Sequence, residues 1–147
     1  MIDYTDLKRT NQSLQTNPFD RYMGHKIIGL DEGESVLMLE ATGDTHSNSR
    51  GDVHKGVLYG MADSAMGVAC ATVGKKVVTL ELSMNYFMPT TIDSRILAKG
   101  HVVHSGGKTL VCTCDFFDEK NRCLGAAKGT FFVIGTVPID DPRFIRS

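Results

Sequence analysis

Asp63 is the residue of this sequence whose surroundings most clearly require a chemical explanation. It lies in an apolar stretch, residues 57–73, that contains no Lys, Arg or Glu and no other carboxylate. Burying an unpaired charge is costly, so such a carboxylate needs either a partner or a function. Carboxylates in apolar sites can act as general bases that activate water near neutral pH. The stretch alone leaves two interpretations open: a general base, or a buried structural aspartate bonded to hydroxyls or amides.

A polar segment, residues 48–56, leads into this stretch. It contains Asn48, which by itself is an ordinary turn residue, and His54, which by itself is a structural histidine at a helix start. Glycine then recurs at about helical spacing, at positions 56, 60 and 67. Glycine is unfavourable in helices, so several in one buried helix indicate that another element approaches the helix backbone closely.

The elements that position these residues can be predicted from hydrophobic periodicity. Residues 57–73 are apolar nearly all round, which predicts a buried helix. After residue 73 the hydrophobic period changes to about two, which is typical of strands. Strands are predicted over residues 22–30, 35–41, 76–87, 94–104, 109–118 and 122–134. Strands on both sides of one long helix predict an α+β fold, with an antiparallel sheet packed on that helix.

Length and composition predict one domain over residues 1–147. Residues 1–21 are expected to begin with a helical segment that is broken at Asn17-Pro18, and residues 135–147 to form a loose tail. Within the predicted strand 76–87, residues 77, 79, 81, 83 and 85 are expected to face the same way.

Charge and cysteine content narrow the function classes. The net charge of -1 and the lack of a Lys/Arg cluster argue against a nucleic-acid partner. The polar first ten residues predict no secretory signal, and residues 57–73 are too short and interrupted for a membrane span. We therefore expect a cytoplasmic protein with reduced, buried thiols and neither disulfides nor a metal site. The cysteines are Cys70, Cys112, Cys114 and Cys123.

The polar segment and the apolar stretch together resemble the PaaI-like acyl-CoA thioesterases of the hotdog-fold superfamily. The residues that carry this resemblance are Asn48, Gly51, His54-Lys55-Gly56 and Asp63. The similarity continues through residues 78–82, 85–89 and 107–110 and covers roughly residues 35–134. It implies a sheet curled around the central helix. One position departs from the family pattern, because Lys55 replaces the middle residue of His-Gly-Gly.

The resemblance implies an enzyme that hydrolyses a small acyl- or aryl-coenzyme A to the free acid and coenzyme A, without metal or cofactor. Asp63 would be the general base or the nucleophile. A helix start offers unpaired N–H groups and a partial positive charge, which stabilise an oxyanion. The family pattern places the oxyanion donor at the backbone N–H of Lys55, with help from Gly56. Replacing a glycine side chain with lysine leaves that amide in place.

The remaining implied site residues have plain structural alternatives. Asn48 would donate to the thioester oxygen or hold the attacking water, and His54 would orient the loop or contact the carbonyl. Thr79 would help to position water, although threonine is also an ordinary strand residue. A turn would run along the coenzyme A pantetheine or phosphates, although Gly-Gly-Lys is common in simple hairpins. That turn consists of Ser105, Gly106, Gly107 and Lys108.

Two other functions fit the same fold. One is a non-catalytic acyl-CoA sensor, which would not need the Asp63 carboxylate. The other is a dehydratase with an essential histidine base, which fits less well because His54 belongs to the thioesterase-like pattern. The resemblance also implies a homodimer or homotetramer whose sites combine residues of two chains, with Asn48 and Lys55 of one chain facing Asp63 of the other.

Overall fold

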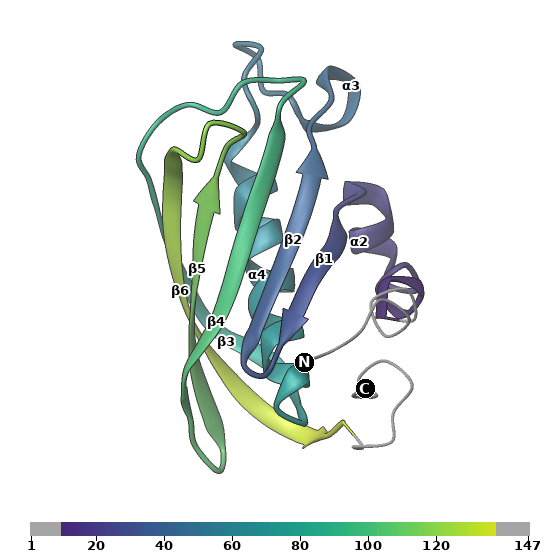
Figure 1. Ribbon diagram of the computed structural model, residues 1–147, viewed down its shortest axis with the longest axis vertical. Helices are drawn as coiled ribbons and strands as arrows, with labels where there is room; N and C mark the ends of the chain where they lie inside the picture. The colour runs from purple at the N-terminus through teal and green to yellow at the C-terminus, as the bar shows by residue number, and fades with distance from the viewer. Residues whose placement is uncertain (1–9, 138–147) are drawn as a thin grey trace.

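A six-stranded antiparallel sheet curls around one long helix, α4 (Lys55–Thr72), in the computed structural model of the chain, which describes residues 10–137 (Figure 1). The strand order across the sheet is β1-β2-β4-β5-β6-β3. The strands are β1 (Lys26–Asp31), β2 (Glu34–Glu40), β3 (Lys75–Tyr86), β4 (Arg95–Ser105), β5 (Thr109–Phe117) and β6 (Cys123–Thr136). The predicted α+β hotdog architecture is therefore confirmed.

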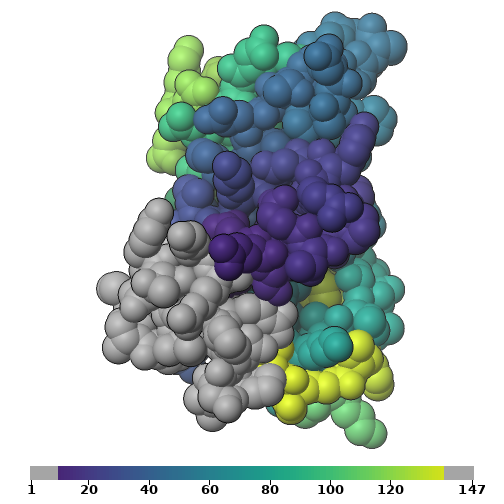
Figure 2. All heavy atoms as spheres, turned by 90° about the vertical axis from the view of Figure 1, so that its right-hand side faces the viewer, coloured from purple at the N-terminus to yellow at the C-terminus, as the bar shows by residue number. Residues whose placement is uncertain are grey.

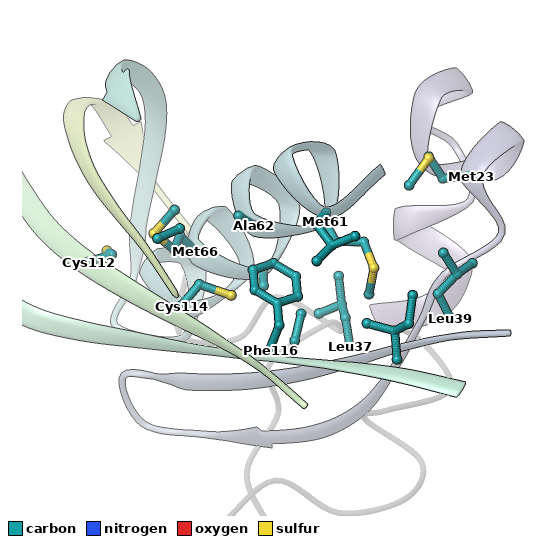
Figure 3. Close-up of a cluster of buried hydrophobic side chains, with 14 of the residues drawn as sticks. Met23, Leu37, Leu39, Met61, Ala62, Met66, Cys112, Cys114 and Phe116 are labelled. Carbon is teal, nitrogen blue, oxygen red and sulfur yellow. The ribbon is translucent and has the colours of Figure 1, made fainter. Parts of the chain in front are cut away.

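Small residues let the sheet approach α4 closely. A Cβ on Gly100 of β4 would lie 2.6 Å from the backbone oxygen of Ala65, so only glycine fits there. The Ser35 hydroxyl of β2 donates to the same oxygen at 2.6 Å. Met61 and Met66 are fully buried between α4 and the sheet, beside Phe116 (Figure 3). Burial of each such side chain stabilises the fold by roughly 1.5–3 kcal/mol.

The prediction of a strand over residues 22–30 is wrong in its first part. Residues 10–14 are helical, and a second helix, α2 (Pro18–Met23), precedes β1. The Asn17 side chain caps α2 by accepting from Phe19 N at 3.1 Å, and Pro18 occupies the first helical turn. Gly24, at φ 81°, ends the helix. A short helix, α3 (Gly43–His46), also lies in the segment before α4 and was not predicted.

A bulge in β3 corrects the prediction that its odd-numbered residues share one face. The register with β6 shifts between Thr79 and Glu81. Val77 packs against the core before this shift, whereas Leu82, Met84 and Tyr86 do so after it. A one-residue insertion moves every later side chain to the other face. The bulge therefore leaves Thr79 directed at α4 while it turns the second half of the strand over.

Three of the four free cysteines, Cys70, Cys112 and Cys114, are buried as predicted, whereas Cys123 is only half-buried. Burial raises the pKa of the Cys114 thiol, which keeps it protonated. β6 continues to Thr136, so the predicted tail begins later than residue 135. The remainder of that tail and the start of the predicted N-terminal helix lie outside the described residues. Between residues 10 and 137, no helix is long and apolar enough to cross a membrane.

Candidate active site

Asp63 lies on the side of α4 that faces β3. The hydroxyl of Thr79 donates to its Oδ1 at 2.6 Å, so the structure brings together two residues that were singled out in the sequence. The expectation that Asp63 is buried is wrong for the single chain, because its side chain is exposed. Most apolar residues of α4 are buried, whereas Asp63 lies with Tyr59 and Gly56 on a narrow exposed strip, from which Asp63 and Tyr59 bond to the edge strand β3.

Asn48 holds the loop before α4 in shape and keeps its amide nitrogen available. Its Oδ1 accepts from the backbone N–H of Arg50 at 2.9 Å and of Asp52 at 3.1 Å. Gly51 completes the turn at φ 83°, a conformation that favours glycine. Within residues 10–137 the Nδ2 group of Asn48 has no hydrogen-bond partner, so it can donate to a ligand.

The first turn of α4 leaves the Lys55 amide free. His54 is the N-cap, and its Nδ1 accepts from Gly56 N at 2.8 Å. Val57 N donates to His54 O at 3.0 Å. The N–H of Lys55 is left without an acceptor in the described part of the chain, at the positive end of the helix dipole. The Gly56 amide, in contrast, donates to His54 Nδ1 and is therefore not free to bind the oxyanion beside Lys55.

The side chain of Lys55 is held against a tyrosine that sequence reasoning missed. Its Nζ lies 4.9 Å from the centre of the Tyr86 ring, and the Tyr86 hydroxyl donates to the Lys55 carbonyl oxygen at 3.0 Å. Burial, followed by the neighbouring Tyr59, raises the pKa of Tyr86, which keeps it a hydrogen-bond donor. Tyr86 therefore fixes the backbone of Lys55 from one side while its ring accommodates the ammonium group.

The free amide and the carboxylate do not meet within one chain. Lys55 and Asp63 are both on α4, eight residues apart, which corresponds to about 12 Å along the helix axis. One carbonyl group cannot contact both at hydrogen-bond distance. The turn at residues 105–108 is far from the loop that holds Asn48 and His54. The β4–β5 hairpin and the loop before α4 lie at opposite ends of the molecule (Figure 1). Its contact with coenzyme A stays a prediction.

A pocket of about 520 Å³ opens beside Asp63, and no motif in the sequence predicted it. It lies between the N-terminal segment, residues 10–17, the outward face of α4 and the ends of β3 and β6. In Figure 2 this region lies between the purple N-terminal segment and the yellow end of β6. Asp63 and Thr79 both line it, so the pair opens directly onto a space that a ligand can enter.

A buried polar network fastens α2 to α4 next to Asp63. Asp20 is 3% exposed, and its Oδ1 accepts from the Ser64 hydroxyl at 2.6 Å. His25 Nε2 lies 2.7 Å from the same oxygen, while its buried Nδ1 has no partner in the described chain. The Nε2 atom therefore carries the proton that is shared with Asp20. This network fixes Ser64, the residue that follows Asp63, against α2.

A sequence model of the Thioesterase superfamily matches residues 50–124. The acyl-coenzyme A thioesterase PaaI of Escherichia coli is 26% identical over 113 residues, which are 77% of this chain and 80% of that protein. Its structure matches with a TM-score of 0.81 at 22% identity, over 90% of this chain and 96% of that one.

Two further solved structures are similar. A variant of the phenylacetic acid degradation protein PaaI from Thermus thermophilus is 31% identical, with a TM-score of 0.75, over 80% of this chain and 100% of that one. A hypothetical thioesterase from Streptococcus pneumoniae, solved with coenzyme A, is 28% identical, with a TM-score of 0.74, over 78% of this chain and 91% of that one. That protein has also been solved as two variants, in which an aspartate and a threonine 16 positions apart are each replaced by alanine.

Proposed function

The chain belongs to the thioesterase superfamily, among its PaaI-like hotdog members, and on this premise we propose that it hydrolyses small acyl- or aryl-coenzyme A thioesters. The observation that carries the proposal is the hydrogen-bonded pair Asp63–Thr79 at the mouth of a pocket. The Escherichia coli relative is named an acyl-coenzyme A thioesterase, and the Streptococcus pneumoniae relative was solved with coenzyme A. Asp63 and Thr79 are also 16 positions apart, as are the two residues replaced in that relative.

In the proposed reaction Asp63 removes a proton from water, and the water oxygen attacks the thioester carbonyl carbon. The carbonyl oxygen becomes an oxyanion, which accepts a hydrogen bond from the backbone N–H of Lys55. When the tetrahedral intermediate collapses, the carbon–sulfur bond breaks and the thiolate of coenzyme A takes the proton from Asp63. Direct attack by the carboxylate is the alternative, with an anhydride that water then opens. Thr79 orients the carboxylate in either case.

The oxyanion donor and the base come from different chains in this proposal. Their separation of about 12 Å along α4 prevents them from acting on one carbonyl within a chain. β3 is an edge strand of twelve residues, and Val78 and Leu80 on it are 45% and 59% exposed. A long apolar edge of this kind favours pairing with another strand. Pairing of β3 with its copy in a homodimer would carry Asp63 and Thr79 of one chain toward the partner, where Asn48 Nδ2 and the Lys55 amide can complete the site.

The experiment that tests the function is the release of free thiol from a panel of acyl- and aryl-coenzyme A thioesters. We expect turnover of at least one substrate at a kcat typical of enzymes, on the order of 1 per second or faster. Tight binding of the same compounds without thiol release would instead assign the chain to the non-catalytic sensor class.

Thr79→Val is expected to lower kcat by roughly tenfold, because a lost hydrogen bond to a charged group costs about 1.5–3 kcal/mol and part of it is recovered from water. The KM should change little, since Thr79 orients the base and does not hold the coenzyme A. Steady-state thiol release measures both quantities. Thr130→Val, on the outward side of β6, is the matched control and should behave as the wild type. Equal kcat for both variants would exclude an orienting role for Thr79.

A further inference from the structure

We propose that the pocket beside Asp63 holds the acyl group, that it takes an apolar acyl group larger than acetyl, and that Gly67 sets its size limit. This inference rests on the proposed hydrolysis and deepens it. The pocket follows the outward face of α4 from Asp63 past Gly67 to Ala71. Eight residues of helix correspond to a length of about 12 Å, which extends well beyond an acetyl group placed at Asp63.

Part of the inner wall of the pocket supplies hydrocarbon that an apolar acyl group can contact. Its innermost side chains include Ile27, Phe131 and Val137, which are 3%, 1% and 7% exposed. Six of its polar residues are exposed and form the rim: Asp63, Thr79, Thr16, Asn17, Lys76 and Thr136. Its other polar residues lie deeper, since Ser13, Ser64 and Lys75 are half-buried and Thr10 is buried. A ligand that reacts at Asp63 therefore passes an exposed polar rim and meets hydrocarbon from the three apolar side chains on the inner wall, together with a few polar groups.

Two glycines on α4 have opposite surroundings, and the contrast identifies Gly67. A Cβ on Gly60 would lie 2.6 Å from the ring of Phe19, because α2 already fills the space over that glycine. A Cβ on Gly67 would meet nothing within 4 Å. Gly67 therefore borders empty volume that belongs to the pocket, and a side chain there would occupy it without displacing protein atoms of residues 10–137.

The pocket wall across from α4 is the segment of residues 10–17, and hydrogen bonds hold it in place. Asn11 clamps β1 through two hydrogen bonds, since its Nδ2 donates to Ile27 O and its Oδ1 accepts from Ile27 N, each at 2.7 Å. The network of Asp20, His25 and Ser64 fixes the other end of this segment to α4. A wall that is held in place before binding loses little entropy when the ligand arrives, so the pocket can discriminate by size.

Binding of non-hydrolysable thioethers tests this proposal without depending on turnover. In the wild type, isothermal titration calorimetry should show S-hexyl-coenzyme A binding on the order of 100-fold tighter than coenzyme A, because each buried methylene adds a few-fold to affinity. Gly67→Leu should reduce this advantage to less than about threefold and leave the affinity for coenzyme A itself unchanged. Leucine is the better helix former, so the variant should fold at least as stably.

The control is Gly43→Leu, because a Cβ at that exposed position would lie 3.8 Å from Ile92, an ordinary contact far from the pocket in sequence and fold. It should keep the full preference for the hexyl thioether. The proposal is overturned if Gly67→Leu also keeps that preference. It is equally overturned if light scattering shows that Gly67→Leu dissociates an oligomer that Gly43→Leu preserves, since Gly67 would then serve contact between chains.

Hydrolysis of two substrates with different acyl lengths distinguishes a failure of this proposal from a failure of the thioesterase function on which it rests. Gly67→Leu should lower kcat/KM for hexanoyl-coenzyme A by about 30-fold or more while acetyl-coenzyme A changes by less than about threefold. Equal losses for both substrates in an active enzyme would refute the size limit and leave the thioesterase function intact. A wild type that hydrolyses neither substrate would refute the function, and the calorimetry would still decide whether Gly67 borders an acyl site.

Discussion

Asp63→Asn is expected to lower kcat by at least about 100-fold with little change in KM or stability. Asparagine has the same shape but cannot take a proton from water or attack the carbonyl. The Thr79 hydroxyl can still donate to the side-chain oxygen, so the geometry observed at 2.6 Å is retained. Since Asp63 is exposed in the single chain, the exchange introduces no burial cost there.

Thiol release measures the loss, and circular dichroism with thermal unfolding verifies the fold of Asp63→Asn. Asp115→Asn is the matched control, because Asp115 is an exposed carboxylate on β5 outside the proposed site. It should hydrolyse at the wild-type rate. Near wild-type turnover by Asp63→Asn would remove this residue from the reaction.

Lys55→Pro is expected to lower kcat by on the order of 100-fold or more, because it deletes the one N–H proposed to meet the oxyanion. The helix should tolerate it, since Lys55 is the first residue of α4, where proline is favoured. His54, at φ -61° and ψ 138°, already has the extended conformation that proline imposes on the preceding residue. An active, folded proline variant would transfer the oxyanion role to Asn48, because the Gly56 amide is used by the cap.

Lys55→Gly is the matched variant that keeps the amide and removes the side chain. Its kcat should stay within about threefold of the wild type, because the lost contact is a single cation–π interaction between the half-buried Lys55 and Tyr86 side chains. A KM rise of up to roughly tenfold that shrinks at high salt would show that the ammonium group also reaches a coenzyme A phosphate. A kcat loss equal to that of Lys55→Pro would show that the side chain, and not the amide, matters.

The parts of the structure that were predictable depend on local pattern. The change of hydrophobic period after residue 73 correctly separated α4 from the strands that follow it, and hairpin connections made the sheet antiparallel. The family resemblance pointed to Asp63 and Thr79, which the fold brings into contact although they are 16 positions apart. The free amide of Lys55 was expected from its place at a helix start.

The parts that were missed depend on contacts between distant segments. The exposed strip of α4 could not be recognised, because residues 57–73 are apolar nearly throughout and Asp63 is the only charged residue among them. The pocket forms where residues 10–17 dock on β1 through Asn11. This contact joins distant segments, so no local sequence pattern predicts it. The bulge at Thr79 likewise depends on the pairing of β3 with β6, and it turned over half of a strand whose alternation had seemed regular.

The central claim is that one active site combines the Lys55 amide of one chain with Asp63 of another, and a mixed dimer tests it most directly. Lys55→Pro and Asp63→Asn chains carrying different affinity tags are co-expressed, and the dimer that contains both is purified. Each homodimer should be nearly inactive, whereas the mixed dimer should recover about half of the wild-type kcat, since one of its two symmetry-related sites is intact. A mixed dimer as inactive as the two homodimers, or light scattering that shows a fully active monomer, would contradict the account.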